Sequence, residues 1–330
     1  MEFPKSSPIP DISVVLCTFN GGRYLQEQLD SIARQSRLPA ELVVCDDCSA
    51  DDTIAILKSF AADVPFPVRI IENVQRLGST RNFDKAIGIA SGELIALCDQ
   101  DDRWAPNKLE RLSDLLIGDS FVGGIFSDAN LIDESSEPVG LRLFTKHKFS
   151  TSKQQKFLNN PTSVLLKHDV VTGSTLMFRA CLRTHCQPIP ESWVHDGWLT
   201  WMITLHSRMA LTTETLTDYR LHAGQQLGVG SGRDGTARNS GAETRRQHYA
   251  RVAKQFGDLL SHLLDRGWKD QSELVRKIRE KIAFLERQAA LSPSLAVRLP
   301  QMIGLLPQYL QYARGLGSLR KDFLLGRELL

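Results

Sequence analysis

The stretch Leu94-Ile-Ala-Leu-Cys-Asp-Gln-Asp-Asp102 joins five apolar residues to a strongly acidic tetrapeptide. A short, continuous apolar run that ends abruptly is typical of a strand buried on both faces of a parallel sheet. The tetrapeptide places up to three carboxylates where that strand ends. Crowded carboxylates repel one another unless they share a cation, and Mg²⁺ or Mn²⁺ prefers oxygen ligands. This stretch therefore predicts an α/β sheet with a metal and diphosphate site at one edge.

Three similar apolar runs precede this strand, and segments with helical spacing separate them. The expected strands are 12–18, 42–45, 68–71 and 94–98, and the expected helices are 24–34, one opened by Ser49 as N-cap, and 79–90. Strands and helices that alternate at this spacing predict a parallel sheet with helices on both faces. In such sheets, ligands bind at the carboxyl ends of the strands.

Polar side chains gather at three of these four strand ends. The candidate ligand-binding residues are Thr18 and Asn20, with Phe19 between them, at the end of the first strand, Asp46 and Asp47 after the second, and Asp99, Asp101 and Asp102 after the fourth. Turn chemistry can place a single Asn or Asp at such an end, but it does not readily place so many at one edge.

The second half of the chain has a mixed pattern. Strands are expected near 124–127, 174–178 and 215–221, and helices at 198–205, 243–266 and 271–290. Six glycines in residues 224–241 predict a mobile segment. The expected organisation is a catalytic domain over 1–228, a glycine-rich loop over 229–242 and a helical region over 243–330.

Composition excludes several classes of protein. The 330 residues are 42% apolar and 24% charged, which is ordinary for a globular chain with a large core. Forty basic and 38 acidic residues give a net charge of +2, without the basic excess expected of a nucleic-acid-binding protein. Residues 251–330 hold 14 basic and 8 acidic residues (+6), which leaves 26 and 30 (−4) for residues 1–250. Since neither a secretion signal nor a membrane-spanning run is recognisable, we expect a cytoplasmic protein.

Six ordered segments resemble a known family. They are VVLCTFNGGRYLQEQLDSI (14–32), ELVVCDDCSADDT (41–53), NVQRLGSTRNFDKAI (73–87), SGELIALCDQDDRWAPNKLE (91–110), VTGSTLMFR (171–179) and VHDGWLTW (194–201). Together they are similar to family 2 glycosyltransferases with the GT-A fold, and especially to bacterial rhamnosyltransferase-like members that build surface polysaccharides. The resemblance covers roughly residues 11–228. It implies inverting transfer of a sugar, with rhamnose favoured, from a dTDP- or UDP-linked donor to an acceptor hydroxyl.

The resemblance also implies roles for the residues at the strand ends. Thr18 and Phe19 correspond to positions that meet the nucleotide base. Asp46 or Asp47 corresponds to the acid that hydrogen-bonds the pyrimidine. Arg81 corresponds to a basic contact with the nucleotide.

The same comparison assigns a metal site. Asp99 matches the acid near the ribose and the metal, and Asp101 matches the direct ligand of Mn²⁺ or Mg²⁺. Asp102 is expected to contact the donor sugar. His222, in the segment Tyr-Arg-Leu-His that ends the 215–221 strand, is a candidate nitrogen ligand, and Arg220 a candidate contact to the diphosphate.

The segment around residue 196 provides the catalytic candidate. Asp196 corresponds to the general base, although an acid at this point can instead cap the helix that follows. Thr172 and Gly173 match the acceptor-side loop. Trp193 is a candidate for stacking on the acceptor sugar, and His195 is a further acceptor-side candidate, although a structural role suits it better.

Two other functions remain open from the sequence. A nucleotidyltransferase also uses an acidic metal site, but it favours a glycine-rich phosphate loop with a basic residue, which Arg23 fits poorly. A catalytically inactive nucleotide-sugar-binding scaffold is the second. The basic tail is expected either to lie on an anionic membrane surface, near a glycan or lipid-linked acceptor, or to pack on the catalytic domain or on a second copy in a homodimer.

Overall fold

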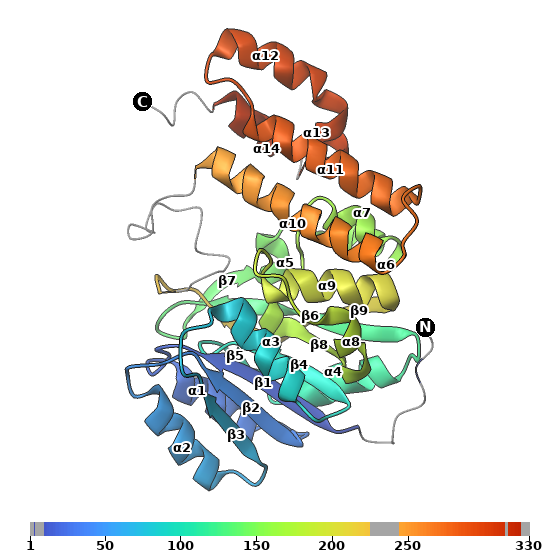
Figure 1. Cartoon of the computed structure of the whole chain (residues 1–330). Coiled ribbons are helices and arrows are strands. Elements are labelled where there is room, and N and C mark those ends of the chain that lie inside the picture. The colour runs from blue at the N-terminus through green and yellow to red at the C-terminus, as the bar shows by residue number, and fades with distance from the viewer. Residues whose placement is uncertain (1–2, 4–9, 225–243, 314–315, 325–330) are drawn as a thin grey trace. The chain divides into compact units, whose positions relative to one another are not determined.

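The computed structural model describes residues 3, 10–224, 244–313 and 316–324, so the expected glycine-rich loop 229–242 lies outside the described residues. The chain forms two compact units. The sheet unit comprises Met1–Pro161 and Val170–Asp234, and the helical unit comprises Thr162–Asp169 and Gly235–Leu330 (Figure 1). The helical unit thus takes a short segment from the middle of the chain in addition to the C-terminal helices.

One sheet organises the sheet unit. Its strands, among the described residues, are β1 (Ile12–Thr18), β2 (Glu41–Asp46), β3 (Val68–Glu72), β4 (Leu94–Cys98), β5 (Arg103–Trp104), β6 (Val122–Ile132), β7 (Pro138–Arg142), β8 (Leu176–Arg179) and β9 (Arg208–Arg220). The order is β3-β2-β1-β4-β8-β6-β9-β5, with β7 beside β6. The first four strands of this order are parallel, and β8 joins β4 to β6 by antiparallel pairing. The predicted α/β fold class is confirmed.

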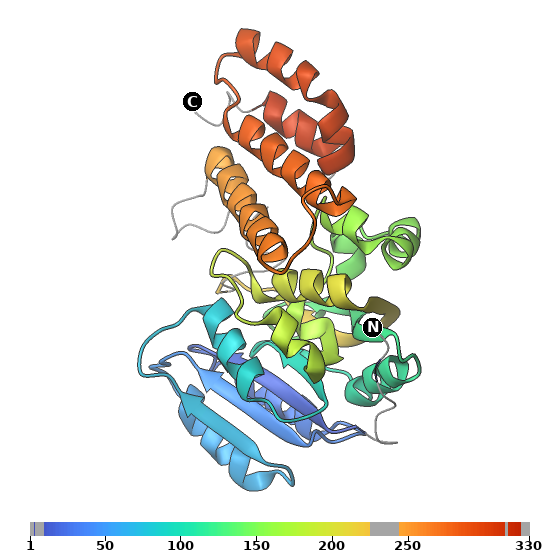
Figure 2. The same ribbon diagram turned by 45° about the vertical axis from the view of Figure 1, so that its right-hand side comes forward.

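Helices cover both faces of this sheet. They are α1 (Leu25–Ala33), α2 (Thr53–Asp63), α3 (Ser79–Ile89), α4 (Lys108–Ile117), α5 (Leu143–Lys146), α6 (Thr151–Asn159), α8 (Arg183–Cys186) and α9 (His195–His206), with the 3₁₀ turns η1 (Gly173–Thr175) and η2 (Ala180–Leu182). Helices α1, α2 and α4 share one hydrophobic cluster with the strands. Helix α3 contacts β1, β2 and α9, and Figure 2 shows it on the face opposite α2.

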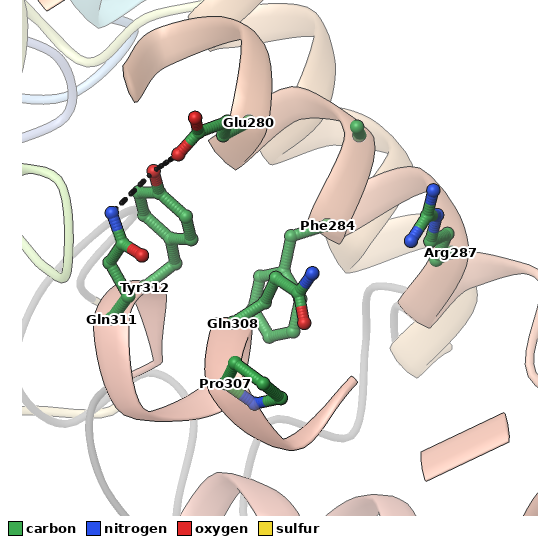
Figure 3. A pocket seen from close by; sticks show the side chains of 8 residues that line it. Glu280, Phe284, Arg287, Pro307, Gln308, Gln311 and Tyr312 are labelled. Atoms are coloured by element: carbon green, nitrogen blue, oxygen red, sulfur yellow. Dashed lines mark hydrogen bonds between the residues drawn. The ribbon is translucent and has the colours of Figure 1, made fainter. Parts of the chain in front are cut away.

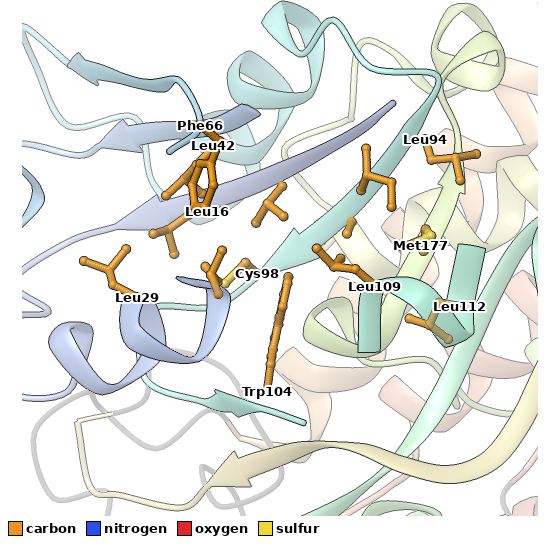
Figure 4. Packing of buried hydrophobic residues seen from close by; sticks show 14 of the residues in the cluster. Leu16, Leu29, Leu42, Phe66, Leu94, Cys98, Trp104, Leu109, Leu112 and Met177 are labelled. Atoms are coloured by element: carbon orange, nitrogen blue, oxygen red, sulfur yellow. The ribbon is translucent and has the colours of Figure 1, made fainter. Parts of the chain in front are cut away.

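The sheet core explains why the strands read as unbroken apolar runs. Figure 4 shows side chains from β1, β2 and β4 packed against those of α1 and α4, including Leu16, Leu29 and Leu109. All three are fully buried. Replacing one such leucine by alanine costs about 2–5 kcal/mol, because a cavity adds to the lost burial.

Most predicted elements are confirmed, and two differ. Residues 12–18 and 94–98 are strands with the predicted limits. Helix α2 begins at Thr53 after Asp52, so the prediction that Ser49 caps it is wrong. The hydroxyl of Ser49 bonds instead to Asp46. In the predicted strand 174–178, the first residues form the turn η1, and β8 starts at Leu176.

The helical unit is a group of packed helices with a polar centre. Its helices among the described residues are α7 (Pro161–Leu165), which starts at the unit's edge, α10 (Arg245–Asp265), α11 (Glu273–Ala289), α12 (Leu295–Gly304), α13 (Leu306–Tyr312) and α14 (Leu316–Phe323). The buried carboxylate of Asp322 accepts hydrogen bonds from Tyr249, Tyr309 and Gln288 and pairs with Arg245. No helix within the described ranges combines the length and the apolar character needed to cross a membrane.

Candidate functional site

The ends of β1 and β2 form one side of the site. The two strands pair so that Thr18 lies opposite Asp46, and the Thr18 hydroxyl donates to the Asp46 carboxylate at 2.7 Å. The same carboxylate accepts from the backbone N–H and the hydroxyl of Ser49. Asn20 takes a left-handed backbone conformation, with φ at 47°, and its side-chain oxygen accepts from the N–H of Ala50. The structure therefore brings Thr18, Asn20 and Asp46 together.

Asp47 holds the loop that follows β3. Its oxygens accept from the backbone N–H groups of Leu77 at 2.6 Å and Gly78 at 2.9 Å, and from the Asn73 amide. Gly78 has a φ of 78°, which favours glycine because a side chain strains this conformation. The side chains of Asp46 and Asp47 are buried, and the hydrogen bonds described here join them to other residues of the protein. A contact between either acid and a base stays a prediction.

Phe19 connects the end of β1 to the acidic tetrapeptide. The Gln100 side-chain oxygen accepts from the Phe19 N–H at 2.8 Å, and its amide nitrogen donates to the Phe19 carbonyl at 3.1 Å. The guanidinium of Arg76 lies 3.7 Å from the centre of the Phe19 ring. A side chain on Gly21 would collide with Gln100. Sequence reasoning missed Gln100 and Arg76, and only the position of Gln100 between two singled-out acids could have indicated it.

The tetrapeptide after β4 divides into accessible and buried acids. Asp99 and Asp101 are partly exposed, whereas Asp102 is fully buried. Burial, then the charges of Asp102, Asp101 and Asp196, raises the pKa of Asp99 well above its usual range. The His222 ring nitrogen Nε2 lies 2.7 Å from an Asp101 oxygen. The structure therefore pairs His222 with Asp101 beside Asp99, and a metal site shared by the three residues stays a prediction.

Burial of Asp102 argues against its predicted role. Its Oδ1 accepts from the backbone N–H of Arg220 at 3.0 Å, which joins the tetrapeptide to the end of β9. A side chain without exposed surface cannot touch a donor sugar while it stays in this position. We therefore reassign Asp102 from sugar contact to support of the neighbouring acids.

Arg220 also differs from the prediction. Its guanidinium is completely buried and pairs with Glu27 of α1, 193 residues away in sequence. It further donates to the carbonyl of Asp101 at 2.8 Å and to the Ser136 hydroxyl at 2.8 Å. Reaching a diphosphate would require Arg220 to leave these partners. We therefore correct its role from a diphosphate contact to an anchor for the backbone of Asp101.

Lys108 is a functional candidate that sequence reasoning missed. This residue is the first of α4, and its side chain is fully buried. Its ammonium donates to the Ser174 carbonyl and, at 2.8 Å, to the Thr217 hydroxyl. Burial lowers the pKa of Lys108, and the charges of Asp102 and Asp99 act in the opposite direction. A lysine at the start of a helical pattern gives no sequence signal of burial.

Asp196 faces the same acids from α9. The helix begins at His195 with Val194 at the cap position, so the alternative that Asp196 caps the helix is wrong. The Asp196 carboxylate accepts from the N–H of Gly197 at 2.7 Å and of Gly173 at 3.2 Å. Burial raises the pKa of Asp196 to about 6, and its charge contributes to the raised pKa of Asp99. The structure therefore places Asp196 near the ends of β4 and of the acceptor-side loop.

The residues around Asp196 are buried rather than exposed to an acceptor. His195 stacks on Phe83 with ring centres 3.8 Å apart, and burial lowers the pKa of His195 to about 3. Trp193 is 4% exposed, so its ring cannot stack on a sugar in this position. We correct the acceptor-side predictions for Trp193 and His195 to packing roles. A Cβ on Gly173 would lie 2.7 Å from the His195 ring, which explains the glycine.

Two predicted residues lie at the margin. Arg81 is exposed on α3 and forms an ion pair with Glu191. Thr172 is partly exposed and directly precedes η1, with its hydroxyl 3.5 Å from the His147 ring. Their contacts with a nucleotide and an acceptor stay predictions.

The side chains of Asp99, Asp101 and His222 suit a divalent cation that is also held by a bound ligand. Within the described residues, no three His, Cys, Asp or Glu side chains are grouped as a ready metal site. Asp99 and Asp101 nevertheless lie two residues apart at the end of β4, and the charge of Asp101 adds to burial and to the charge of Asp102 in raising the pKa of Asp99. Mg²⁺-type sites often use one or two carboxylates and complete their ligands with substrate phosphates. The residues present therefore fit a cation that arrives with a phosphorylated ligand.

The chain is similar to known proteins in sequence and in fold. The family model described as glycosyl transferase family 2 matches residues 13–183, slightly more than half of the chain. An uncharacterized glycosyltransferase of Nostoc sp. is 25% identical over 222 residues, which are 64% of this chain and 65% of that protein. The chain thus spans slightly less than two thirds of that relative. The putative teichuronic acid biosynthesis glycosyltransferase TuaG of Bacillus subtilis is 24% identical over 218 residues, 64% of this chain and 79% of TuaG.

A solved structure shares the fold. The mannosyltransferase PcManGT from Pyrobaculum calidifontis, in complex with GDP-Man and Mn²⁺, superposes with a TM-score of 0.57 at 17% identity. The match covers 92% of this chain and 78% of that one. At this identity, the likeness concerns the fold, and it supports the predicted GT-A architecture.

Proposed function

The chain belongs to glycosyl transferase family 2, and we propose that it transfers a sugar from a nucleotide-diphosphate donor to an acceptor hydroxyl. The proximity of two sets of acids carries this proposal. Asp99 and Asp101 lie at the end of β4, and Asp196 on α9 accepts a hydrogen bond from Gly173 of η1, the turn that contacts β4. Such a transfer needs one group to hold the diphosphate and a separate base for the acceptor hydroxyl.

We propose that Asp99, Asp101 and His222 hold Mn²⁺ or Mg²⁺ together with the donor diphosphate. The crowding of the two acids and the 2.7 Å approach of His222 to Asp101 support this assignment. The presence of Mn²⁺ with GDP-Man in the Pyrobaculum structure is consistent with it. When bound, a divalent cation neutralises the charge that develops on the leaving diphosphate. Arg220 keeps the backbone of Asp101 in place through its carbonyl.

Asp196 is the proposed general base of an inverting transfer. Two backbone N–H groups fix the orientation of its carboxylate. Since burial raises the pKa of Asp196 to about 6, it is a stronger base than an ordinary aspartate and is still ionised at neutral pH. The neighbouring His195 is neutral at this pH because burial lowers its pKa to about 3, and it serves as packing.

The resemblance of the six sequence segments favours a rhamnosyl donor linked to dTDP or UDP. For the acceptor we propose a glycan or a lipid-linked glycan in the synthesis of a bacterial surface polysaccharide. The similarity to TuaG, whose name assigns it to teichuronic acid biosynthesis, supports that class. We place the reaction in the cytoplasm, where nucleotide sugars are made.

Release of nucleoside diphosphate from purified nucleotide sugars tests the proposal. The full chain is incubated with each donor and Mn²⁺ or Mg²⁺, and we expect slow release without acceptor for the correct donor. Asp101→Asn should abolish metal-dependent nucleotide binding, measured by titration calorimetry. Asp114→Asn, at an exposed acid of α4, is the matched control and should bind as the original protein does.

Two outcomes would favour the alternatives. Release of pyrophosphate instead of a nucleoside diphosphate would identify a nucleotidyltransferase. The protein would instead be a binding scaffold if it bound nucleotide sugars in a metal-dependent way but released no nucleoside diphosphate, even with a cell extract added to supply acceptors.

A further inference from the structure

A nearly uncharged segment interrupts the basic C-terminal region. Between Arg287 and Arg314, the sequence contains one charged residue, Arg298. Arg298 is 3% exposed, and its guanidinium donates to the carbonyls of Ser292, Pro293 and Phe323. The segment forms α12 and α13, so neither helix presents a charged side chain to solvent.

Large apolar side chains are exposed on these two helices instead. On α12 they are Val297 and the three residues Leu295, Leu299 and Ile303, which are spaced four apart, and on α13 they are Leu306 and Leu310, again four apart. Val297 lies two residues from Leu295 and from Leu299, and so on another side of α12. We call the five residues spaced four apart (Leu295, Leu299, Ile303, Leu306 and Leu310) the apolar stripe. Residues four apart share one side of a helix, so the spacing makes a continuous apolar side on each helix. Ile303 is 68% exposed and Leu310 is 69% exposed. Contiguous exposed apolar patches are uncommon on proteins that have no binding partner.

The core of the helical unit does not need this stripe. The sides of α12 and α13 that face the unit carry Met302, Tyr309 and Tyr312, which are buried. Figure 3 shows the polar side of α13, where Gln308 and Gln311 line a groove of about 340 Å³ against α11. The buried and groove-lining positions of α13 are distinct from Leu306 and Leu310. Folding of this unit therefore leaves the apolar stripe exposed after its own packing is complete.

The charge on the neighbouring helix α14 distinguishes between possible partners of the stripe. Helix α14 packs against α12 and α13 and exposes Arg320 and Lys321. Its acid, Asp322, is buried and paired with Arg245 in the interior. Two copies that met through α12, α13 and α14 would bring these basic side chains of α14 together. An anionic lipid surface would attract the same charges and accept the apolar side chains.

We propose that the apolar stripe inserts into the interfacial layer of an anionic membrane, with Arg320 and Lys321 against the lipid headgroups. Apolar side chains supply binding energy in proportion to the area they bury, and basic residues strengthen the attraction to such a surface. The stripe lies beyond residue 183, where the family match ends. Membrane docking is therefore a property of the helical unit and independent of the donor chemistry.

Flotation of the full chain with liposomes tests this proposal. We expect binding to vesicles of phosphatidylglycerol and phosphatidylcholine, and weaker binding to phosphatidylcholine alone or at about 0.5 M salt. The double variant Ile303→Gln/Leu310→Gln should bind at least about tenfold more weakly, since both side chains lose their burial in lipid. The matched control, Leu38→Gln/Val74→Gln, removes two exposed apolar residues of the sheet unit and should bind unchanged.

Other results would overturn the inference. Equal flotation of the stripe variant and the original chain would exclude insertion of the stripe. A dimer in light scattering that only the stripe variant abolishes would assign the face to a second copy. Circular dichroism checks folding, and the single variants replace the double variant if it unfolds. Because the vesicles contain no nucleotide sugar, failure here leaves the proposed transfer reaction untouched.

Discussion

Replacing the proposed base by asparagine should make the protein more stable above neutral pH while abolishing transfer. Burial raises the pKa of Asp196 from 3.8 to about 6. Folding with this carboxylate ionised therefore costs about 3 kcal/mol, because each tenfold change in proton affinity corresponds to about 1.4 kcal/mol. Asp196→Asn removes that cost. It also replaces one acceptor of the N–H groups of Gly173 and Gly197 by an amide nitrogen, a loss of about 1 kcal/mol.

The direction of the pKa change fixes how this effect depends on pH. Between about pH 4 and pH 6, the folded protein holds a proton on Asp196 that the unfolded chain has released, so rising pH destabilises the original protein. The variant has no such proton. We expect the two proteins to have nearly equal stability at about pH 4.5. At about pH 8, the variant should be more stable by about 2 kcal/mol, which is the cost of about 3 less the lost acceptor.

Urea unfolding of both proteins at about pH 4.5, 6 and 8 measures this difference. Tryptophan fluorescence follows the sheet unit, because Trp198 and Trp201 are buried in α9 beside Asp196. Donor binding by calorimetry should be retained, and transfer to acceptor should be lost. Unfolding curves of the two proteins that shift in parallel with pH would refute the reasoning, since Asp196 would then have an ordinary pKa. Full transfer by the variant would remove Asp196 from the mechanism.

Three further predictions concern neighbouring residues. Gly173→Ala should lower the free energy of unfolding in urea by about 1–3 kcal/mol, because the new Cβ would collide with the His195 ring. In a protein that already carries His195→Ala, the same substitution should cost much less. Equal costs in the two backgrounds would contradict the contact. Arg220→Met should cost about 1–3 kcal/mol, because the Asp101 carbonyl loses its donor while Glu27 keeps its bonds to Arg103 and Ser136; an unchanged urea midpoint for Arg220→Met would exclude an anchoring role. Transfer activity, as kcat/KM against pH, should fall below about pH 6 as Asp196 becomes protonated, and a profile flat to about pH 5 would contradict this.

The grouping of Thr18, Asp46, Asp99 and Asp101 was predictable because these residues directly follow or end strands of the parallel sheet. Parallel strands bring their carboxyl ends to one edge, so Thr18, Asp46 and Asp99 had to lie near one another once the strands were recognised. The pairing of His222 with Asp101 follows the same logic, since β9 ends at the same site.

Residues that act through distant partners were not predictable. From the sequence, Arg220 is expected to be an exposed basic residue at a strand end. In the structure its guanidinium is buried and forms an ion pair with Glu27 of α1. The position of Trp193, three residues before Asp196, predicts that its ring stacks on an acceptor sugar. In the structure the ring packs against Trp198 and is buried. Sequence spacing states how far apart residues lie along the chain, and it does not say which distant element packs against a side chain.

The sequence by itself determined the order of strands and helices, the acidic edge after β4 and the contrast between an acidic body and a basic tail. Those features depend on periodicity and charge, which are local properties of the chain. Only the tertiary structure separated the accessible acids, Asp99 and Asp101, from the buried Asp102. It also divided the apolar tail residues into buried ones, such as Met302, and exposed ones, such as Ile303. Burial depends on what packs against a residue from elsewhere in the chain, and so the fold decides it.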